Sequence, residues 1–221
     1  MDILAIDGLV KTQISFVVTG TPRSGTTYVA RVLQKLGLDC RHERRFNPWE
    51  IIMEVCRFNE EPWGDSSWLA APFLQALPAD AKVFHVVRDP LSAVNSIIGT
   101  GQIDWPDDYR TFIAKYCWND ANYWPTDVGR DAQTFWVRWN LMIEQSGRVS
   151  RRFRVEETAA AVPGILSDVG LAGVSEQDIA RVLQEVPRNM NARKHRSALR
   201  LTRDDLTPEF IQTARRYGYD Y

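Results

Sequence analysis

The residues from Gly20 to Thr27 (GTPRSGTT) have the types and spacing of a loop that binds phosphate. Two glycines enclose four residues and hydroxyl side chains follow, as in the nucleotide-binding pattern G-x4-G-K-[ST]. Thr26 stands where that pattern has lysine, and the cation lies three residues earlier, at Arg23. Backbone N–H groups of such a loop, together with the N-terminus of a following helix, favour an anion. A tight turn without a ligand is the alternative interpretation.

A predicted strand precedes this loop and a predicted helix follows it. Residues Ile14 to Thr19 (ISFVVT) form a short β-branched run that is typical of a buried strand. From Thr26 onward the apolar residues recur at helical spacing, and Gly37 is a natural helix stop. A phosphate-binding loop requires this order of strand, loop and helix.

A second candidate anion ligand is Arg88, which follows the apolar run KVFHVV (82–87). This run predicts a second buried strand, and Asp89 and Pro90 are favourable as the N-cap and first residue of a helix. In α/β sheets, ligands bind beyond the carboxyl ends of the strands, where Arg88 would lie. An ion pair with a neighbouring acid is the alternative role for Arg88.

The two motifs together resemble those of sulfotransferases that use 3′-phosphoadenosine 5′-phosphosulfate (PAPS). In that family a 5′-phosphosulfate loop has Lys or Arg before Ser-Gly-Thr-Thr, and a later strand ends in Arg-(Asp/Asn)-Pro. A serine follows that arginine eight residues later, and here Ser96 follows Arg88 at that spacing. The resemblance implies that Arg88 and Ser96 hold the 3′-phosphate of the nucleotide. It implies that the 5′-phosphosulfate is held by Arg23, Ser24, Gly25, Thr26 and Thr27.

Sulfuryl transfer requires a cation at the bridging oxygen of the leaving group, and Arg23 is the residue placed for it. It also requires a base near the acceptor hydroxyl. His42 and Glu43 follow the first helix at the position where Golgi and bacterial sulfotransferases often have a Glu or a His-Glu pair. The resemblance favours Glu43 as the base, His42 is the alternative, and a solvated charge cluster is the alternative to both. Because adjacent residues of an extended segment point in opposite directions, we expect only one of them to face the site.

The segment from Arg188 to Arg203 contains six Lys or Arg residues and no acid. Cytosolic small-molecule sulfotransferases have a C-terminal Gly-x-x-Gly-x-x-Lys segment over the 3′-phosphate, which this chain lacks. The nearest substitute contains Arg193 and Lys194, which are candidate ligands of the 3′-phosphate. A solvated basic loop is the alternative. On these grounds the chain resembles the bacterial and Golgi branch more than the cytosolic branch.

Composition is that of an ordinary globular protein, with 221 residues, 44% hydrophobic and 25% charged. We expect one domain over residues 1–221. The net charge of −1 does not favour a nucleic-acid binder. Three cysteines without a CxxC spacing suggest neither a zinc site nor a disulfide framework. The chain shows no signal-peptide pattern and no run of about 18 apolar residues, so we expect a cytoplasmic location and no transmembrane segment.

Strands that alternate with helices predict an α/β fold, a P-loop-like three-layer arrangement with a central, mostly parallel sheet flanked by helices. A third strand is predicted at 152–155. Residues 39–45 form a polar segment after the first helix, and residues 62–67 are expected to be a loop, with Ser66 or Ser67 as the cap of the next helix. The remaining predicted helices cover about 48–58, 67–77, 109–117, 131–145, 163–169, 175–186 and 208–217.

The resulting hypothesis is a PAPS-dependent sulfotransferase that produces 3′-phosphoadenosine 5′-phosphate (PAP) and requires no metal. Its acceptor would be a hydroxyl or amine of a small molecule, carbohydrate or peptide. An ATP-dependent P-loop kinase is one alternative, disfavoured by the missing lysine and by a strand that ends in Arg88 rather than an acid. A non-catalytic PAP- or PAPS-binding module is the other. The acceptor and the oligomeric state are left open.

Overall fold

A computed structural model describes residues 14–46, 64–101, 107–189 and 197–221. Its centre is a five-stranded sheet with the order β2-β3-β1-β4-β5, in which all neighbouring strands are parallel. The strands are β1 (Phe16–Thr19), β2 (Cys40–His42), β3 (Gly64–Ser66), β4 (Lys82–Val87) and β5 (Val149–Arg154). The prediction of an α/β fold with a parallel sheet flanked by helices is confirmed.

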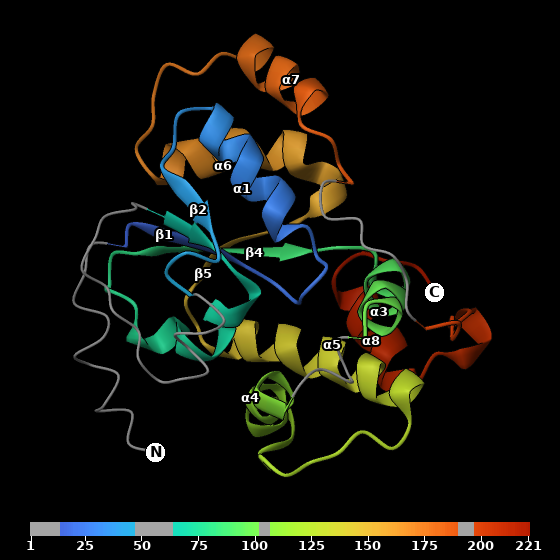
Figure 1. Ribbon diagram of the computed structural model, residues 1–221. Helices are drawn as coiled ribbons and strands as arrows, with labels where there is room; N and C mark the ends of the chain where they lie inside the picture. The colour runs from blue at the N-terminus through green and yellow to red at the C-terminus, as the bar shows by residue number, and fades with distance from the viewer. Residues whose placement is uncertain (1–13, 47–63, 102–106, 190–196) are drawn as a thin grey trace.

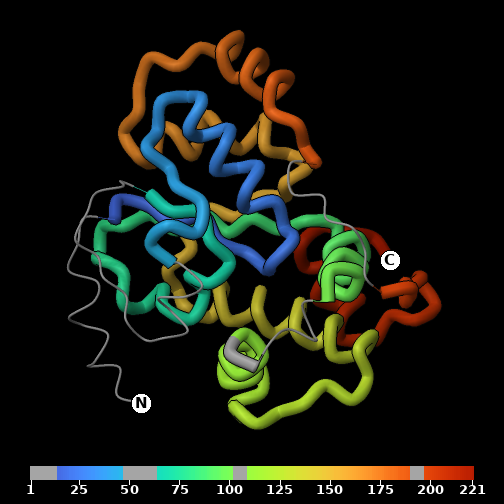
Figure 2. The backbone as a smooth tube through the Cα atoms, viewed as in Figure 1, coloured from blue at the N-terminus to red at the C-terminus, as the bar shows by residue number. Residues whose placement is uncertain are grey.

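Helices cover both faces of the sheet (Figure 1). One face carries α1 (Thr26–Lys35), α6 (Thr158–Asp168) and α7 (Glu176–Glu185). The other carries η2 (Trp68–Ala76, a 3-10 helix), α3 (Pro90–Gly99), α4 (Asp107–Trp118), α5 (Val128–Gln145) and α8 (Pro208–Arg216). Two short 3-10 turns, η3 (Val155–Glu157) and η4 (Arg203–Asp205), complete the described elements. The last residues of the chain return to the start of α3, as the trace in Figure 2 shows.

The central strands have apolar side chains on both faces. Val17 and Val83 point into the core under α5, whereas Val18 and Phe84 point into the core under α1 and α6. Side chains alternate between the two faces of a strand, so a strand covered on both faces requires an unbroken apolar run. The apolar runs that predicted β1 and β4 arise because helices cover both faces of these strands.

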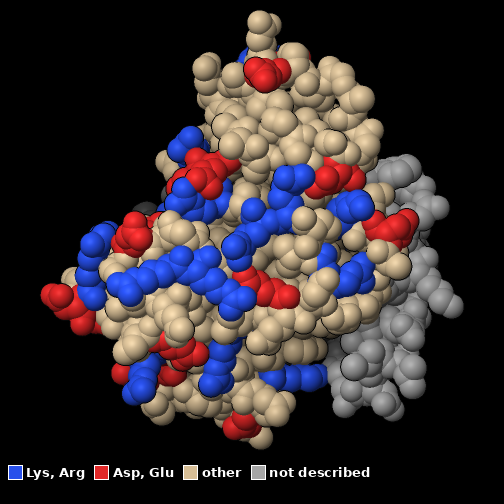
Figure 3. All heavy atoms as spheres, turned by 180° about the vertical axis from the view of Figure 1, so that it is seen from behind, with Lys and Arg blue, Asp and Glu red and all other residues tan. Residues whose placement is uncertain are grey.

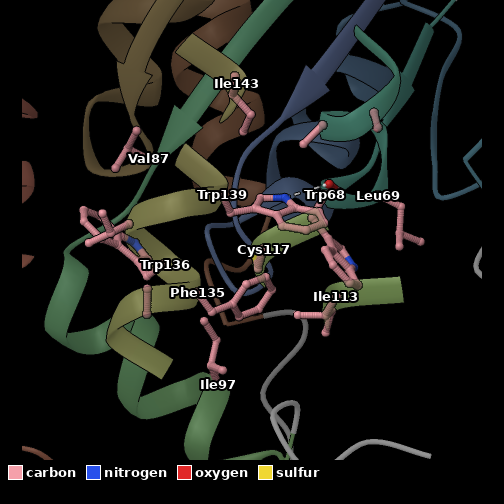
Figure 4. Packing of buried hydrophobic residues seen from close by; sticks show 14 of the residues in the cluster. Trp68, Leu69, Val87, Ile97, Ile113, Cys117, Phe135, Trp136, Trp139 and Ile143 are labelled. Atoms are coloured by element: carbon pink, nitrogen blue, oxygen red, sulfur yellow. Dashed lines mark hydrogen bonds between the residues drawn. The ribbon is translucent and has the colours of Figure 1, made fainter. Parts of the chain in front are cut away.

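The core beneath the sheet is built around tryptophans (Figure 4). Trp136 and Trp139 of α5 are completely buried. The indole Nε1 of Trp139 donates to the Trp68 carbonyl at 3.1 Å, and the two rings lie 5.3 Å apart. The N–H of a buried tryptophan usually finds such a partner. This contact ties α5 to η2, the element that follows β3.

Several elements differ from the sequence-based prediction. Strands β2 and β3 lie where no strand was predicted, in the polar segment 39–45 and the expected loop 62–67, and both strands are short and polar. The helix capped by Ser67 is a 3-10 helix that contains Pro72, which has no N–H to bond along an α-helix. Helices α5 and α6 begin earlier than predicted, at Val128 and Thr158. The helix predicted at 48–58 lies outside the described residues.

Basic side chains on the rear face lie among acidic ones (Figure 3). Along the edge strand β5, for example, Arg151 bonds Asp168 at 3.1 Å, and Arg154 pairs with Glu157. The exposed edge of the sheet therefore has charges of both signs, which discourage pairing with another strand. Over the described part of the chain, no helix has both the length and the apolar character needed to cross a bilayer.

Candidate functional site

The phosphate-loop candidate follows β1 at the carboxyl edge of the sheet, and both of its glycines are required there. A Cβ on Gly20 would overlap the carbonyl oxygen of Val86 in β4. Gly25 has φ 94°, and a Cβ on it would lie 2.6 Å from Cγ2 of Val155. Glycine alone accepts such close approach and such a backbone angle without cost. The loop is thus packed tightly between β4 and the turn that follows β5.

Arg23 also has a left-handed backbone, with φ 69°, which is uncommon for a residue with a side chain. Left-handed residues within a turn help to direct N–H groups to one concave side, as in anion-binding nests. Helix α1 begins directly after Gly25, which offers no side chain as a cap, and its first turn contains no acid. The positive end of the α1 dipole is therefore directed at the loop without local neutralisation.

The hydroxyl groups of the loop fall into two sets. Ser24 is completely buried, and its Oγ lies 2.6 Å from Oγ1 of Thr21, so this side chain shapes the loop from inside. Thr26 and Thr27 instead lie beside His42, with Oγ1–Nε2 distances of 3.4 and 3.0 Å. Only the second set reaches the segment that contains the candidate base.

Arg88 and Ser96 lie against the phosphate loop. The Nε of Arg23 donates to Oγ of Ser96 at 2.8 Å. Nη1 of Arg88 donates to the backbone oxygen of Arg23 at 3.1 Å. The pairs are 73 and 65 residues apart in the chain, so only the fold brings them together. The result is a site with two guanidinium groups at the ends of β1 and β4.

His42 ends β2, and Glu43 follows it with φ 51°. This left-handed residue interrupts the alternation of an extended segment, so both side chains turn to the same side. His42 Nε2 and Glu43 Oε1 are 3.7 Å apart. The two side chains therefore lie together rather than on opposite sides, and His42 contacts the phosphate loop. That only one of the two faces the site stays a prediction. Burial, and then the positive charge of Arg31, lowers the pKa of His42 to about 4, so its imidazole is neutral at pH 7.

Sequence reasoning missed the residues of β3 that hold this segment. Asp65 is completely buried, and its carboxylate accepts hydrogen bonds from the backbone N–H groups of residues 44–46. Ser66 donates from Oγ to the carbonyl of Thr26 at 2.8 Å, and its own carbonyl accepts the N–H of Glu43 at 3.2 Å. The run GDSS is also typical of a turn, so its composition carries no distinct strand signal.

On the other side of the site, the start of α3 is held by a network of side chains. Asp89 is the predicted N-cap, and its Oδ1 accepts the Ser92 N–H at 2.8 Å. The N–H of Asp89 donates to Glu156 Oε1 at 3.0 Å, and Tyr219 donates to the other oxygen of Glu156 at 2.8 Å. Tyr221 bonds the second oxygen of Asp89. These contacts fix the residues that directly follow Arg88.

The other candidate ligands, Arg193 and Lys194, lie outside the described residues. The chain that follows them is attached beside the site, because Asn95 bonds both backbone groups of Leu201. Its amide nitrogen donates to the Leu201 carbonyl at 3.0 Å, and its oxygen accepts the Leu201 N–H at 2.7 Å. Asn95 directly precedes Ser96 in α3.

Two solved sulfotransferases have the same fold as this chain. A crystal structure of mouse sulfotransferase SULT7A1 complexed with PAP aligns with a TM-score of 0.52 and 14% identity, over 98% of this chain and 85% of that one. A crystal structure of a sulfotransferase from Alicyclobacillus acidocaldarius aligns with a TM-score of 0.52 and 14% identity, over 93% and 94% of the two chains. No protein-family model matches the chain, and no curated protein matches it either.

At this level of identity the likeness concerns the fold. The chain has a sulfotransferase-like α/β fold with a parallel five-stranded sheet. The placement nearer to the bacterial and Golgi branch stays a prediction.

Proposed function

We propose that this chain is a sulfotransferase that moves a sulfuryl group from PAPS to a hydroxyl or amine of an acceptor. The observation that carries the proposal is the direct contact between the two predicted anion-binding motifs through Arg23, Arg88 and Ser96. A nucleotide with anionic groups at both its 5′ and 3′ positions needs two such motifs side by side. The complex of mouse SULT7A1 with PAP supports a nucleotide of this class.

The residues present fit such a nucleotide. The loop has two required glycines, an uncapped helix N-terminus and Arg23, all suited to a 5′-phosphosulfate. Arg88 and Ser96 are the residues that would give a 3′-phosphate a charge-assisted hydrogen bond and a hydroxyl hydrogen bond. The Nε of Arg23 donates to Ser96, so the two motifs are in direct contact.

PAPS supplies a sulfuryl group that is activated by a phosphate leaving group. The acceptor atom forms a bond to sulfur while the bond between sulfur and the bridging oxygen breaks. Arg23 stabilises the negative charge that develops on that oxygen. Glu43 or His42 takes the proton that the acceptor loses.

Basicity alone does not decide between His42 and Glu43. A base is most effective when its pKa is near the working pH, but the pKa of His42 is lowered to about 4, which is close to the ordinary pKa of a glutamate. The resemblance to sulfotransferases therefore remains the reason to favour Glu43. The neutral imidazole lies 3.0 Å from Thr27 Oγ1 and 3.7 Å from the Glu43 carboxylate. His42 is therefore suited to orient Glu43 and the acceptor hydroxyl, and it stays the alternative base.

The nucleotide preference provides the first test. PAP should raise the melting temperature far more than ATP with Mg²⁺ or 5′-AMP, because only a ligand of the folded state stabilises it. Ser96→Ala should reduce the shift with PAP, whereas Ser92→Ala, one turn earlier on α3, should retain it. Equal or greater stabilisation by ATP with Mg²⁺ would contradict the proposal and favour a kinase.

A turnover assay then separates an enzyme from a binding module. Labelled PAPS would be incubated with panels of small-molecule, carbohydrate and peptide acceptors, and sulfated product would be counted. Label transfer to one acceptor class supports the proposal and identifies that class. Binding of PAP with no transfer to any acceptor would favour the non-catalytic module.

A further inference from the structure

One buried carboxylate holds the chain directly after the candidate base. Asp65 Oδ1 accepts the N–H of Arg44 at 3.1 Å. Asp65 Oδ2 accepts the N–H groups of Arg45 at 3.1 Å and Phe46 at 2.9 Å. Three successive backbone donors thus converge on one side chain from a strand about twenty residues later.

These donors begin at the residue after Glu43, whose backbone is left-handed. Such a conformation is unfavourable for glutamate and persists only where surrounding contacts hold it. We propose that Asp65 is a positioning residue for the proposed sulfuryl transfer, which fixes the turn that places His42 and Glu43 beside the phosphate loop. This inference rests on the proposed function, but its structural part can be tested without it.

The neighbour of Asp65 links the same strand to the phosphate loop. Ser66 accepts the N–H of Glu43 with its carbonyl and donates from its hydroxyl to the carbonyl of Thr26. Successive side chains of a strand point to opposite faces, so Asp65 and Ser66 act on different segments. Strand β3 therefore sets the position of the base segment relative to the first turn of α1.

A carboxylate suits this place better than its neutral relatives. Ionised Asp65 has only acceptor atoms, whereas asparagine would direct an NH₂ group at backbone N–H groups. An apolar side chain would leave buried N–H groups without partners. Burial raises the pKa of Asp65 to about 6, while its backbone hydrogen bonds act in the opposite direction. The carboxylate of Asp65 therefore stays ionised at neutral pH, although burial disfavours its charge.

Asp131 offers a matched control. It is also buried, and its Oδ2 accepts the N–H groups of Thr126 at 3.0 Å and Asp127 at 3.1 Å. Its other oxygen accepts the hydroxyl of Tyr123 at 2.7 Å. This carboxylate organises the loop before α5, which contributes none of the candidate site residues. If Asp65 serves stability alone, Asp65→Asn and Asp131→Asn should have the same consequences.

The experiment compares the wild-type chain with Asp65→Asn and Asp131→Asn. In Asp65→Asn, hydrogen exchange at the amides of residues 44–46 should accelerate about 10-fold or more, as expected for local opening. The pKa of His42, followed by NMR of the imidazole, should move from about 4 toward its ordinary 6.5. Turnover at saturating substrates should fall about 10-fold or more while the Kd for PAP stays within about threefold. Asp131→Asn should show none of these changes.

Unchanged exchange at 44–46 together with an unchanged pKa of His42 in Asp65→Asn would overturn the proposal. So would a loss of turnover no larger than that of Asp131→Asn at equal melting temperature. If the wild-type chain sulfates no acceptor, the proposed function fails, whereas the exchange and NMR measurements still decide whether Asp65 positions the segment.

A measurement on the wild-type chain covers the case in which Asp65→Asn does not fold. Protection of the amides of 44–46, corrected for intrinsic exchange, should weaken as pH falls through about 6, and that of 126–127 should not. The charged or titratable residues nearest in sequence to this contact are Cys40, Arg41 and His42 of β2, with Glu43, Arg44 and Arg45 of the loop. The thiol of Cys40 has a raised pKa and His42 titrates near 4, so neither produces a transition at pH 6, and the same measurement on Glu43→Gln separates Glu43 from Asp65. Protection at 44–46 that stays constant over the whole pH range in which carboxylates titrate would refute the role of Asp65.

Discussion

The two sides of the candidate site are held by different kinds of contact. On the β4 side, Arg88 follows a strand of six residues, and Asp89 caps the next helix through the N–H of Ser92, three residues away. On the β2 side, the strand has three residues, and Asp65 shapes the next turn from 19 to 21 residues away. The groups suited to hold nucleotide thus have a local helix cap in addition to the distant contacts of Glu156 and Tyr221. The groups suited to proton transfer depend on a distant carboxylate, so the two functions should respond separately to substitution.

The largest difference between the effect on turnover and the effect on nucleotide affinity is expected at Glu43. Glu43→Gln retains the size of the side chain but removes the proton acceptor, so turnover should fall roughly 10²-fold or more. The Kd for PAP should stay within about threefold, because the β4 side is unchanged. Initial rates with PAPS and titration calorimetry with PAP provide the two measurements.

His42→Ala is the companion of that variant. If His42 orients Glu43, His42→Ala should lose less turnover than Glu43→Gln does. The reverse order would identify His42 as the base. Full activity of the double variant would exclude both residues and direct the search to other groups.

Substitution of Arg23 and of Arg88 should also have different effects on turnover and on nucleotide affinity. Arg23→Ala should reduce turnover more than nucleotide affinity, because charge on the bridging oxygen grows in the transition state. Arg88→Ala should mainly weaken PAP binding, by about 10- to 100-fold for the loss of a charge-assisted bond. For both variants, turnover is measured by rates at saturating substrate and PAP affinity by calorimetry. Equal losses of affinity with unchanged turnover would show that the division of roles is wrong.

The stability of the β2 side should depend on pH in a particular way. The pKa of Asp65 is raised by burial from 3.8 to about 6, so the folded state binds a proton more tightly than the unfolded state. Its contribution to the free energy of unfolding therefore falls as pH rises from about 4 to 6. The pKa values of half-buried His42 and of buried His85 are lowered to about 4, so their contributions rise over about pH 4 to 6.5.

Removing the carboxylate should remove the contribution that opposes the rising contributions of the histidines. Urea unfolding of Asp65→Asn should thus show a steeper rise of stability between pH 4 and 6 than the wild-type chain. The two profiles should diverge by on the order of 2 kcal/mol across that range. Parallel profiles would mean that the ionisation of Asp65 does not differ between the folded and unfolded states.

The same contrast explains what could be predicted from the sequence. The strand before Arg88, its helix cap and the glycines of the phosphate loop have local signals, and the structure confirms these elements. Strand β3 was missed because Gly-Asp-Ser is also the composition of a turn, and the segment becomes a strand through its pairing with β1 and β2. The positive φ of Glu43 was missed because its support comes from Asp65, a contact that no sequence spacing reveals.

The smallest effect is expected where the β4 side itself depends on a distant residue. The hydroxyl of Tyr221 bonds Asp89 and accepts the N–H of Leu91 at 3.2 Å, so it supports the first turn of α3. Tyr221→Phe removes that group and should cost about 0.5–1.5 kcal/mol of folding free energy. Because this turn follows Arg88 directly, the Kd for PAP should rise a few-fold, while turnover at saturation stays unchanged.

Tyr123→Phe is the matched control for this variant, because its hydroxyl also bonds a carboxylate, that of Asp131 at 2.7 Å. Both variants lose one hydroxyl–carboxylate bond, but only Tyr221 contacts the helix that contains Ser96. Thermal unfolding should therefore show similar losses for the two, and PAP titration should show a weaker affinity only for Tyr221→Phe. An effect on turnover without one on affinity would mean that the two sides of the site are coupled through α3, contrary to the separation inferred from their contacts.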